Sequence, residues 1–284
     1  MKRSRPKWIL SFFVLFSTFA FASEIKDNST KNSESKTRIV SLAPSLTEFL
    51  FLLGLGPNII GNTIYCDYPP QAKSILKVGD FVSFDVEKIL KLNPSHVVAT
   101  NGNNLFQIQM IKKAGIPVVE YPVSRLFEIV PALQKMGKDF QKLEESQKWV
   151  KDFEHKKGFL LKKAEGKRRL NVLIVLQLHP LLVVGKSTFI SDLFELANLK
   201  NIVNLDGYPS LEWGYLKSNA VDVVVFPVET TLVGDPLKAQ EIKSLFHKKG
   251  VSNSKMRVVL WDQAELSRPG PRVVQVLDRL IRDF

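Results

Sequence analysis

Apolar and polar residues follow one another along this chain in a pattern that predicts an α/β protein. After residue 36, short apolar runs typical of buried strands alternate with segments whose apolar residues recur at helical spacing. A repeated strand–helix–strand order predicts right-handed crossovers and mainly parallel sheets. The predicted strands span residues 38–42, 59–61, 96–99, 117–121, 170–176, 202–203, 221–226 and 257–261.

One segment in the middle of the chain, Leu143–Glu165, predicts a single long helix. Apolar residues such as Trp149, Phe153 and Leu160 recur there at mostly helical intervals, while Lys, Glu and Gln fill the other positions. Gly166 is a typical stop signal. Such a helix would be roughly 35 Å long. It is either an ordinary domain helix or a rigid connection between two lobes.

The second interpretation of this helix is favoured because an α/β region lies on each side of it. Residues 86–98 also resemble residues 213–225 weakly, with a loop, a short helix and a buried strand in both. We therefore predict two Rossmann-like lobes joined by the long helix, with a ligand cleft between them. The expected divisions are a first lobe at 37–123, a connecting helical segment at 124–166 and a second lobe at 167–284.

The N-terminus predicts export. A basic start is followed by an apolar run that ends in Ala-Phe-Ala at residues 20–22, which is typical of a cleaved secretory signal peptide. An uncleaved membrane anchor is the alternative. Residues 23–36 are polar and predict a flexible leader. The chain has a single cysteine, Cys66, so an internal disulfide is excluded.

Charge and motifs exclude several classes of function. The 284 residues have a formal net charge of +12, but the basic residues are dispersed among acidic ones rather than gathered with aromatics as in nucleic-acid binders. Gly185-Lys186-Ser187 lacks the preceding glycine of a phosphate-binding loop, and no G-x-S-x-G motif is present. The four histidines lack metal-ligand spacing. We therefore expect no catalytic residues, no metal site and no enzymatic activity.

Candidate binding residues follow from the rule that open parallel sheets bind ligands beyond the carboxyl ends of their strands. Aromatic, amide and loop residues at these ends suit a large, partly apolar ligand with hydrogen-bonding edges. We also expect Ser45 to cap the first helix in a capping box with Glu48. The candidates at strand ends are Pro44, Ser45, Tyr65, Asp67, Phe81, Asn101, Tyr208 and Trp261.

Two further acids, Glu87 and Glu212, each open a helix, one in each predicted lobe. Either acid alone is explained by the helix dipole. As a pair, they suit docking to a partner that presents arginines, because such charge pairs fix orientation.

Several of these segments together resemble one known family. They are Arg38-Ile-Val-Ser-Leu-Ala-Pro-Ser-Leu-Thr-Glu48, Tyr65-Cys-Asp-Tyr-Pro-Pro70, Gly79-Asp-Phe-Val-Ser83, Asn93-Pro94, Gly185-Lys-Ser-Thr-Phe-Ile190 and Arg268-Pro-Gly-Pro-Arg272. Over residues 38–284 the chain resembles the periplasmic substrate-binding proteins of ABC importers for cobalamin, iron-siderophores and haem. Tyr65–Pro70 is most similar to the cobalamin-binding subgroup.

The resemblance implies a function and roles for particular residues. Tyr65 would contact a corrin ring, Phe81 would stack on it, and Tyr208 would replace a tryptophan, whereas Thr100 stands where some members have one. Glu87 and Glu212 would pair with permease arginines. Arg268 is a further expected ligand-binding residue. Together with Arg272 it keeps a siderophore possible as the ligand, because siderophore binders tend to use arginine clusters.

The function implied is therefore capture of cobalamin in the periplasm and its delivery to an inner-membrane ABC permease dimer with its ATPase. Cobalamin would be a transported ligand and not a cofactor, and we expect a monomer whose lobes move little on binding. The alternatives are a haem or ferric-siderophore binder of the same family, a secreted enzyme of this fold, or a chaperone-like interaction protein with an empty cleft.

Overall fold

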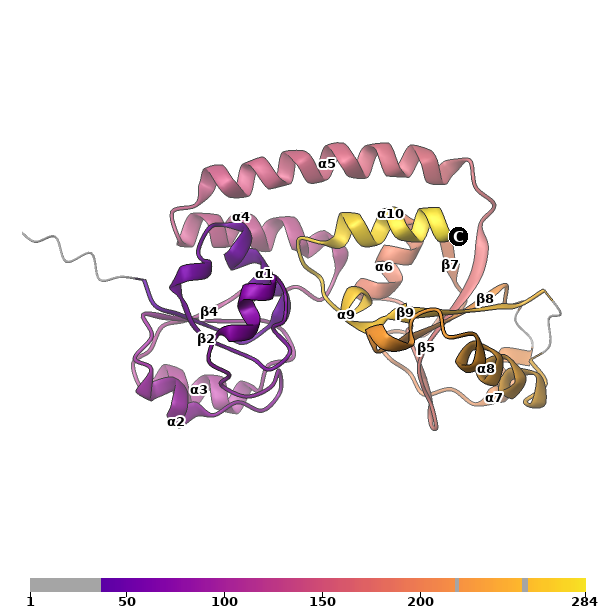
Figure 1. The fold of residues 1–284 in the computed structure, drawn as a ribbon, viewed down its shortest axis with the longest axis horizontal. Coiled ribbons are helices and arrows are strands. Elements are labelled where there is room, and N and C mark those ends of the chain that lie inside the picture. The colour runs from indigo at the N-terminus through magenta and orange to yellow at the C-terminus, as the bar shows by residue number, and fades with distance from the viewer. Residues whose placement is uncertain (1–36, 218–219, 252–254) are drawn as a thin grey trace, which may run out of the picture. The chain divides into compact units, whose positions relative to one another are not determined.

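The computed structural model describes residues 37–217, 220–251 and 255–284, which form two separate β-sheets with surrounding helices (Figure 1). The predicted signal peptide and leader lie outside the described residues. In the described ranges no helix is both long enough and apolar enough to cross a membrane.

The first sheet is entirely parallel, with strand order β2-β1-β3-β4. Its strands are β1 (Ile39–Ser41), β2 (Ile59–Asn62), β3 (His96–Ala99) and β4 (Val118–Glu120). The accompanying helices are α1 (Pro44–Leu52), α2 (Val86–Lys91), α3 (Leu105–Lys113) and α4 (Ile129–Asp139). The four strands occupy the places predicted from the apolar pattern.

Alternating strand residues divide the core of this lobe between the two faces of its sheet. Ile39 and Val98 belong to the apolar cluster that includes residues of α1 and α4. Their strand neighbours Val40 and Val97 belong to the cluster formed with α2 and α3. Because successive side chains of a strand point to opposite faces, helices cover both faces of the sheet.

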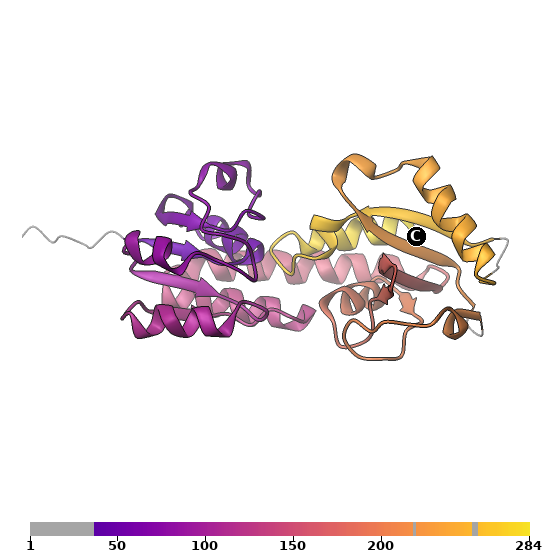
Figure 2. The ribbon, with the colours of Figure 1, turned by 90° about the horizontal axis from the view of Figure 1, so that it is seen from below.

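The second sheet has strand order β6-β5-β8-β9, with β7 also paired to β5. Its strands are β5 (Leu170–Leu178), β6 (Leu181–Val183), β7 (Leu199–Asn201), β8 (Val223–Val228) and β9 (Arg257–Asp262). Among these named strands only the pairing of β5 with β6 is antiparallel. The helices are α6 (Phe189–Leu196), α7 (Trp213–Lys217), α8 (Pro236–Lys248), α9 (Gln263–Leu266) and α10 (Val273–Asp283), and α8 packs against β9 (Figure 2).

The structure corrects two details of the predicted strands in this lobe. The strand predicted at 202–203 is displaced to β7, because the left-handed residue Asn198 (φ 62°) returns the chain to β5 at once. The strand predicted at 170–176 continues to Leu178 and turns back as β6, which is too short for a periodic signal.

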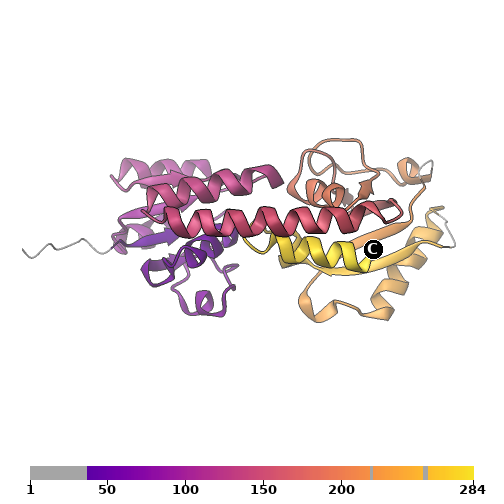
Figure 3. The ribbon, with the colours of Figure 1, turned by 90° about the horizontal axis from the view of Figure 1, so that it is seen from above.

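The long central helix is confirmed as α5 (Leu143–Glu165). It packs against α4 at one end of its length and against α10 at the other (Figure 3). One continuous apolar cluster includes Phe49 of α1, Phe153 and Leu160 of α5, and Leu280 of α10. The helix is therefore built into the cores of both lobes. Short 3₁₀ turns occupy Gly56–Asn58, Pro70–Ser74, Leu126–Glu128 and Thr230–Leu232.

Candidate ligand-binding site

A loop with two exposed tyrosines follows the carboxyl end of β2. Tyr65 and Tyr68 expose 52% and 44% of their surfaces. Between them Cys66 is buried, with its Sγ 3.2 Å from the hydroxyl of Thr47 and 3.1 Å from that of Thr63. The buried thiol therefore anchors the loop while both tyrosine side chains reach the surface.

The ammonium group of Lys77 holds the base of the same loop. Its Nζ donates hydrogen bonds to Asn62 Oδ1 at 2.7 Å and to the carbonyl oxygens of Cys66 and Ala72, each at 3.0 Å. Burial lowers the pKa of Lys77. Lys77 was not among the predicted site residues, because nothing in the neighbouring sequence distinguishes it from an ordinary surface lysine.

Two arginines between α9 and α10 reach this loop from the second lobe. The side chain of Arg268 is 11% exposed, forms an ion pair with the carboxylate of Asp67, and donates to the carbonyl oxygen of Tyr65 at 3.0 Å. The guanidinium carbon of Arg272 lies 4.2 Å from the ring centroid of Tyr68. Three predicted site residues, Tyr65, Asp67 and Arg268, are thus in direct contact.

Glu48 of α1 is the buried acid of this cluster, with a side chain that is only 2% exposed. Arg272 donates to it through two nitrogens, Nη2 at 2.7 Å and Nε at 2.9 Å. Burial favours neutral Arg272, but the bonds to Glu48 outweigh it and raise the pKa of Arg272. In the same way, partial burial opposes ionisation of Asp67, but Arg268 lowers the pKa of its carboxyl. The positive charges of Arg268 and Arg272 are therefore paired with the negative charges of Asp67 and Glu48.

The amino end of α1 lies beside these arginines. The helix begins at Pro44, its cap residue is Ala43, and Ser45 is buried in the first turn without a capping bond. The predicted capping box of Ser45 with Glu48 is therefore wrong, because proline suits the first helical position and moves Ser45 inside. A Cβ placed on Gly270 would lie 3.6 Å from the Cα of Ser45, so the chain between the arginines passes over this helix end.

Phe81 is partly buried and lies on the turn that contains Asn101. A Cβ placed on Gly102, which has a φ of 92°, would lie 2.8 Å from the Phe81 ring. The side chain of Asn103 donates to the carbonyl oxygens of Phe81 at 2.7 Å and Leu42 at 3.0 Å. Asn103, which was not among the predicted site residues, therefore fixes the Phe81 loop and its own turn to the carboxyl end of β1. Asn101 remains exposed.

Tyr208 presents its ring from the second lobe and exposes 52% of its surface. Its loop is held against Gly185, whose N–H donates to the carbonyl oxygen of Gly207 at 2.8 Å. A Cβ on Gly185 would lie 2.1 Å from the carbonyl oxygen of Leu205, so only glycine permits this approach. Partial burial of the phenol raises the pKa of Tyr208.

Trp261 does not lie where the sequence analysis expected it. Its side chain is fully buried in the apolar cluster, stacks on Phe284 at 6.0 Å between centroids, and donates its indole N–H to Glu265 at 3.1 Å. Arg279 covers its ring at 4.4 Å. With both faces and its polar atom engaged, Trp261 is a core residue and not part of an exposed ligand surface.

The two acids proposed for docking are both exposed. Glu87 lies in the first turn of α2, which is capped by Asp85, and its side chain is 77% exposed while it pairs with Lys91 at 2.6 Å. Glu212 directly precedes α7 and is exposed. Each carboxylate is thus free to meet a partner, and no contact between them is implied.

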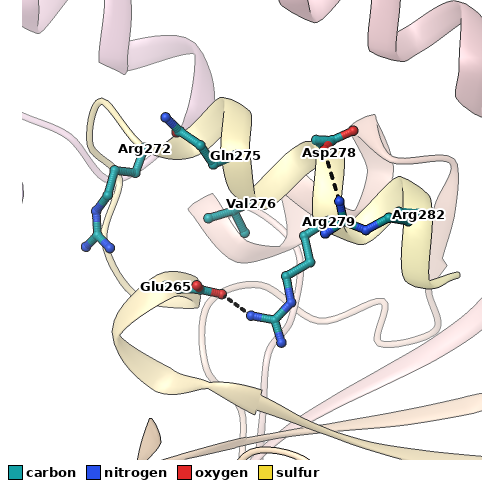
Figure 4. A pocket seen from close by; sticks show the side chains of 7 residues that line it. All are labelled: Glu265, Arg272, Gln275, Val276, Asp278, Arg279 and Arg282. Atoms are coloured by element: carbon teal, nitrogen blue, oxygen red, sulfur yellow. Dashed lines mark hydrogen bonds and ion pairs between the residues drawn. The ribbon is translucent and has the colours of Figure 1, made fainter.

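A groove of about 350 Å³ lies along α10 and is lined by Glu265, Arg272, Gln275, Val276, Asp278, Arg279 and Arg282 (Figure 4). Arg279 pairs with Glu265 at 2.7 Å, and Arg282 pairs with Asp278 at 3.5 Å. Since Arg272 is bound to Glu48, each arginine of the groove already has a carboxylate partner. The groove is explained by side-chain pairing and was not predicted as a site.

Known proteins resemble this chain in both sequence and fold. A vitamin B12-binding protein of Pectobacterium carotovorum is 25% identical over 240 residues, which cover 84% of each chain. The periplasmic vitamin B12-binding protein of Vibrio cholerae superposes with a TM-score of 0.72 at 22% identity, covering 87% of this chain and 95% of the other. The periplasmic heme-binding protein of a Roseiflexus species in its apo form superposes with a TM-score of 0.76 at 21% identity, covering 87% and 97%.

The two superpositions are below 25% identity and therefore establish the fold alone, a two-lobed α/β architecture. The family assignment comes from the sequence, because the profile of a family described as "Periplasmic binding protein" matches residues 39–242. That match covers the whole first sheet and, in the second lobe, runs from β5 through β8 into α8. The chain therefore belongs to the periplasmic binding protein family, whose members serve ABC importers.

Proposed function

We propose that this protein captures a corrinoid, with cobalamin as the expected ligand, and delivers it to an ABC permease with its ATPase in the inner membrane. It would do so in the periplasm, after export, without catalysing a reaction. The rings of Tyr65, Phe81 and Tyr208 and the amide of Asn101 are the proposed ligand contacts, with Pro44 and Ser45 behind them. Glu87 and Glu212 are the proposed docking residues for the permease.

The matched charges around the tyrosine loop are the observation that favours a corrinoid. Arg268 and Arg272, which would otherwise attract an anionic ligand, are bound to Asp67 and Glu48. A corrin ring has neutral amide side chains, whereas haem has propionates and many siderophores are anionic. Aromatic surface with neutral hydrogen-bonding groups therefore fits the corrin better. The vitamin B12-binding name of the Pectobacterium relative supports the same ligand.

Calorimetric titration of the purified protein with cyanocobalamin, haemin and a ferric siderophore tests the proposal. We expect saturable binding of cyanocobalamin alone. Tyr65→Ala should weaken that binding by about tenfold, the usual loss for one aromatic contact together with its buried area. Phe159→Ala is the matched control, because Phe159 is an aromatic residue on α5 that is 68% exposed and far from the loop in the sequence.

Two outcomes would overturn the proposal. Tight haemin binding without a response to cyanocobalamin would replace the corrinoid by haem, the ligand named for the Roseiflexus structure. Turnover of any bound ligand would restore the possibility of an enzyme. An equal loss of affinity in the Tyr65 and Phe159 variants would mean that the tyrosine loop is not the binding surface.

A further inference from the structure

We infer that residues 268–272, here called the arginine strap, hold the Tyr65–Tyr68 loop in its binding conformation and so couple ligand affinity to the position of the second lobe. This inference rests on the proposed function and extends it. Arg268 and Arg272 become positioning residues, and Asp67 becomes their anchor on the loop, in place of the ligand contacts expected for Asp67 and Arg268.

The loop is held by its own lobe and by the other. Lys77 of the first lobe binds the carbonyl oxygens of Cys66 and Ala72. On either side of Cys66, the carbonyl oxygen of Tyr65 and the carboxylate of Asp67 are bound by Arg268. The segment that presents the tyrosine rings is therefore positioned in part by a side chain from outside its lobe.

The strap belongs to the second lobe because it connects α9 to α10. It ends at α10, which packs on α6 and on α5. Arg272 is the firmer of its two contacts, since it binds the buried Glu48 through two nitrogens and covers the ring of Tyr68. A movement of the second lobe relative to α1 would therefore also displace Arg268 and Arg272, and with them the tyrosine loop that they contact.

The geometry of the outer pair suits a contact that can open. The side chain of Asp67 is 47% exposed, whereas that of Arg268 is 11% exposed. When the lobes are spread, water can replace the guanidinium at Asp67 at small cost, whereas Tyr65 and Asp67 lose the contacts that Arg268 supplies. A permease that moves one lobe would thereby release the tyrosines from the ligand without touching the loop itself.

Backbone hydrogen exchange of residues 64–70 tests the positioning role without any ligand. We expect Arg268→Gln and Asp67→Asn each to raise exchange in this segment by about tenfold, the factor that corresponds to one lost charge-assisted hydrogen bond. Asp67→Asn removes the same pair from its more exposed side, so it tests the contact even if Arg268→Gln fails to fold. The double variant, with Arg268→Gln and Asp67→Asn together, should exchange no faster than Arg268→Gln alone, because both substitutions remove the same ion pair.

Asp192→Asn is the matched control. Asp192 of α6 accepts two bonds at 2.7 Å from Arg125, so it also joins the second lobe to the preceding part of the chain through a bidentate arginine. That pair does not touch the tyrosine loop. We expect exchange of residues 64–70 to stay at the wild-type rate in this variant.

Binding kinetics supply the functional readout. In Arg268→Gln the dissociation rate of cyanocobalamin should rise by about tenfold, with the association rate little changed, and Arg268→Lys should recover part of the loss. Unchanged exchange in both Arg268→Gln and Asp67→Asn, or an equal rise in Asp192→Asn, would overturn the inference. If the wild-type protein bound no cyanocobalamin, the proposed function would fail, and the exchange experiment would still decide the role of the strap.

Discussion

Replacing Arg272 by glutamine should destabilise the protein more than replacing Glu48 by glutamine, because the carboxylate is the more deeply buried half of this pair. The side chain of Glu48 is 2% exposed, and that of Arg272 is 24% exposed. Without Arg272, the ion-pair partner that remains for the Glu48 carboxylate among the described residues is Arg268, at 3.9 Å. Leaving a buried charge unpaired costs about 3–5 kcal/mol. The lost cation over the Tyr68 ring adds about 0.5–1 kcal/mol.

The opposite change is milder. Without the acid, Arg272 can turn its guanidinium towards water, so Glu48→Gln should cost about 1.5–3 kcal/mol, the net value of hydrogen bonds to a charged group. In the double variant no buried charge remains and two amides face each other. We therefore expect the double variant to be more stable than Arg272→Gln alone, which is a favourable coupling between the two positions.

Urea denaturation at neutral pH, followed by circular dichroism, measures these free energies of unfolding. Arg282→Gln is the control, because Arg282 pairs with Asp278 at 3.5 Å at a position where its side chain is 60% exposed, and such surface pairs contribute less than about 1 kcal/mol. The reasoning is refuted if Glu48→Gln costs as much as Arg272→Gln. It is also refuted if the double variant shows the sum of the two single losses.

Two further predictions concern transport and pH. Glu87→Ala and Glu212→Ala should leave the calorimetric affinity for cyanocobalamin unchanged but reduce its uptake by cells. Glu144→Ala on α5 is the control and should change neither affinity nor uptake. A collapse of affinity in the Glu87 or Glu212 variant would mean that these acids belong to the binding surface. Because burial raises the pKa of Tyr208 above its ordinary 10.0, its folded phenol stays protonated where an unfolded one ionises, so the contribution of Tyr208 to stability is complete below pH 10.0 and falls above it. The near-ultraviolet absorbance difference between wild type and Tyr208→Phe should therefore show a phenolate titration with its midpoint above pH 10.0, and a midpoint at or below pH 10.0 would contradict this.

Local sequence signals were sufficient for the elements whose determinants lie close together in the chain. The long helix Leu143–Glu165 has the predicted bounds. Such a helix is set by residues near each other in the sequence, as are α2 and α8, where Asp85 and Asp235 cap N–H groups two or three residues away. Parallel pairing followed from the strand–helix alternation, so the fold class was also predictable.

The candidate site was predictable only in part, because its contacts join distant residues. Arg268 and Asp67 are 201 positions apart, so the sequence placed both in the site without showing that they bind each other. The rule that ligands bind beyond the carboxyl ends of parallel strands led to the wrong placement of Trp261 in the site. Asp262 caps α9 by accepting from the N–H groups of Ala264 and Glu265, and the chain turns at that point while the indole stays in the core.

The separation of Glu48 from Arg272, 224 positions along the chain, also affects how the protein matures. A polypeptide is synthesised from its N-terminus, so the first lobe is complete long before residue 272 exists. Until then α1 would bury a carboxylate without its guanidinium, which is unfavourable. We therefore expect the first lobe to reach its full stability only after residue 272 has been synthesised. Under the export proposed above, such a delay would keep the nascent chain unfolded for longer, the state in which secretory chains are threaded through a translocation channel.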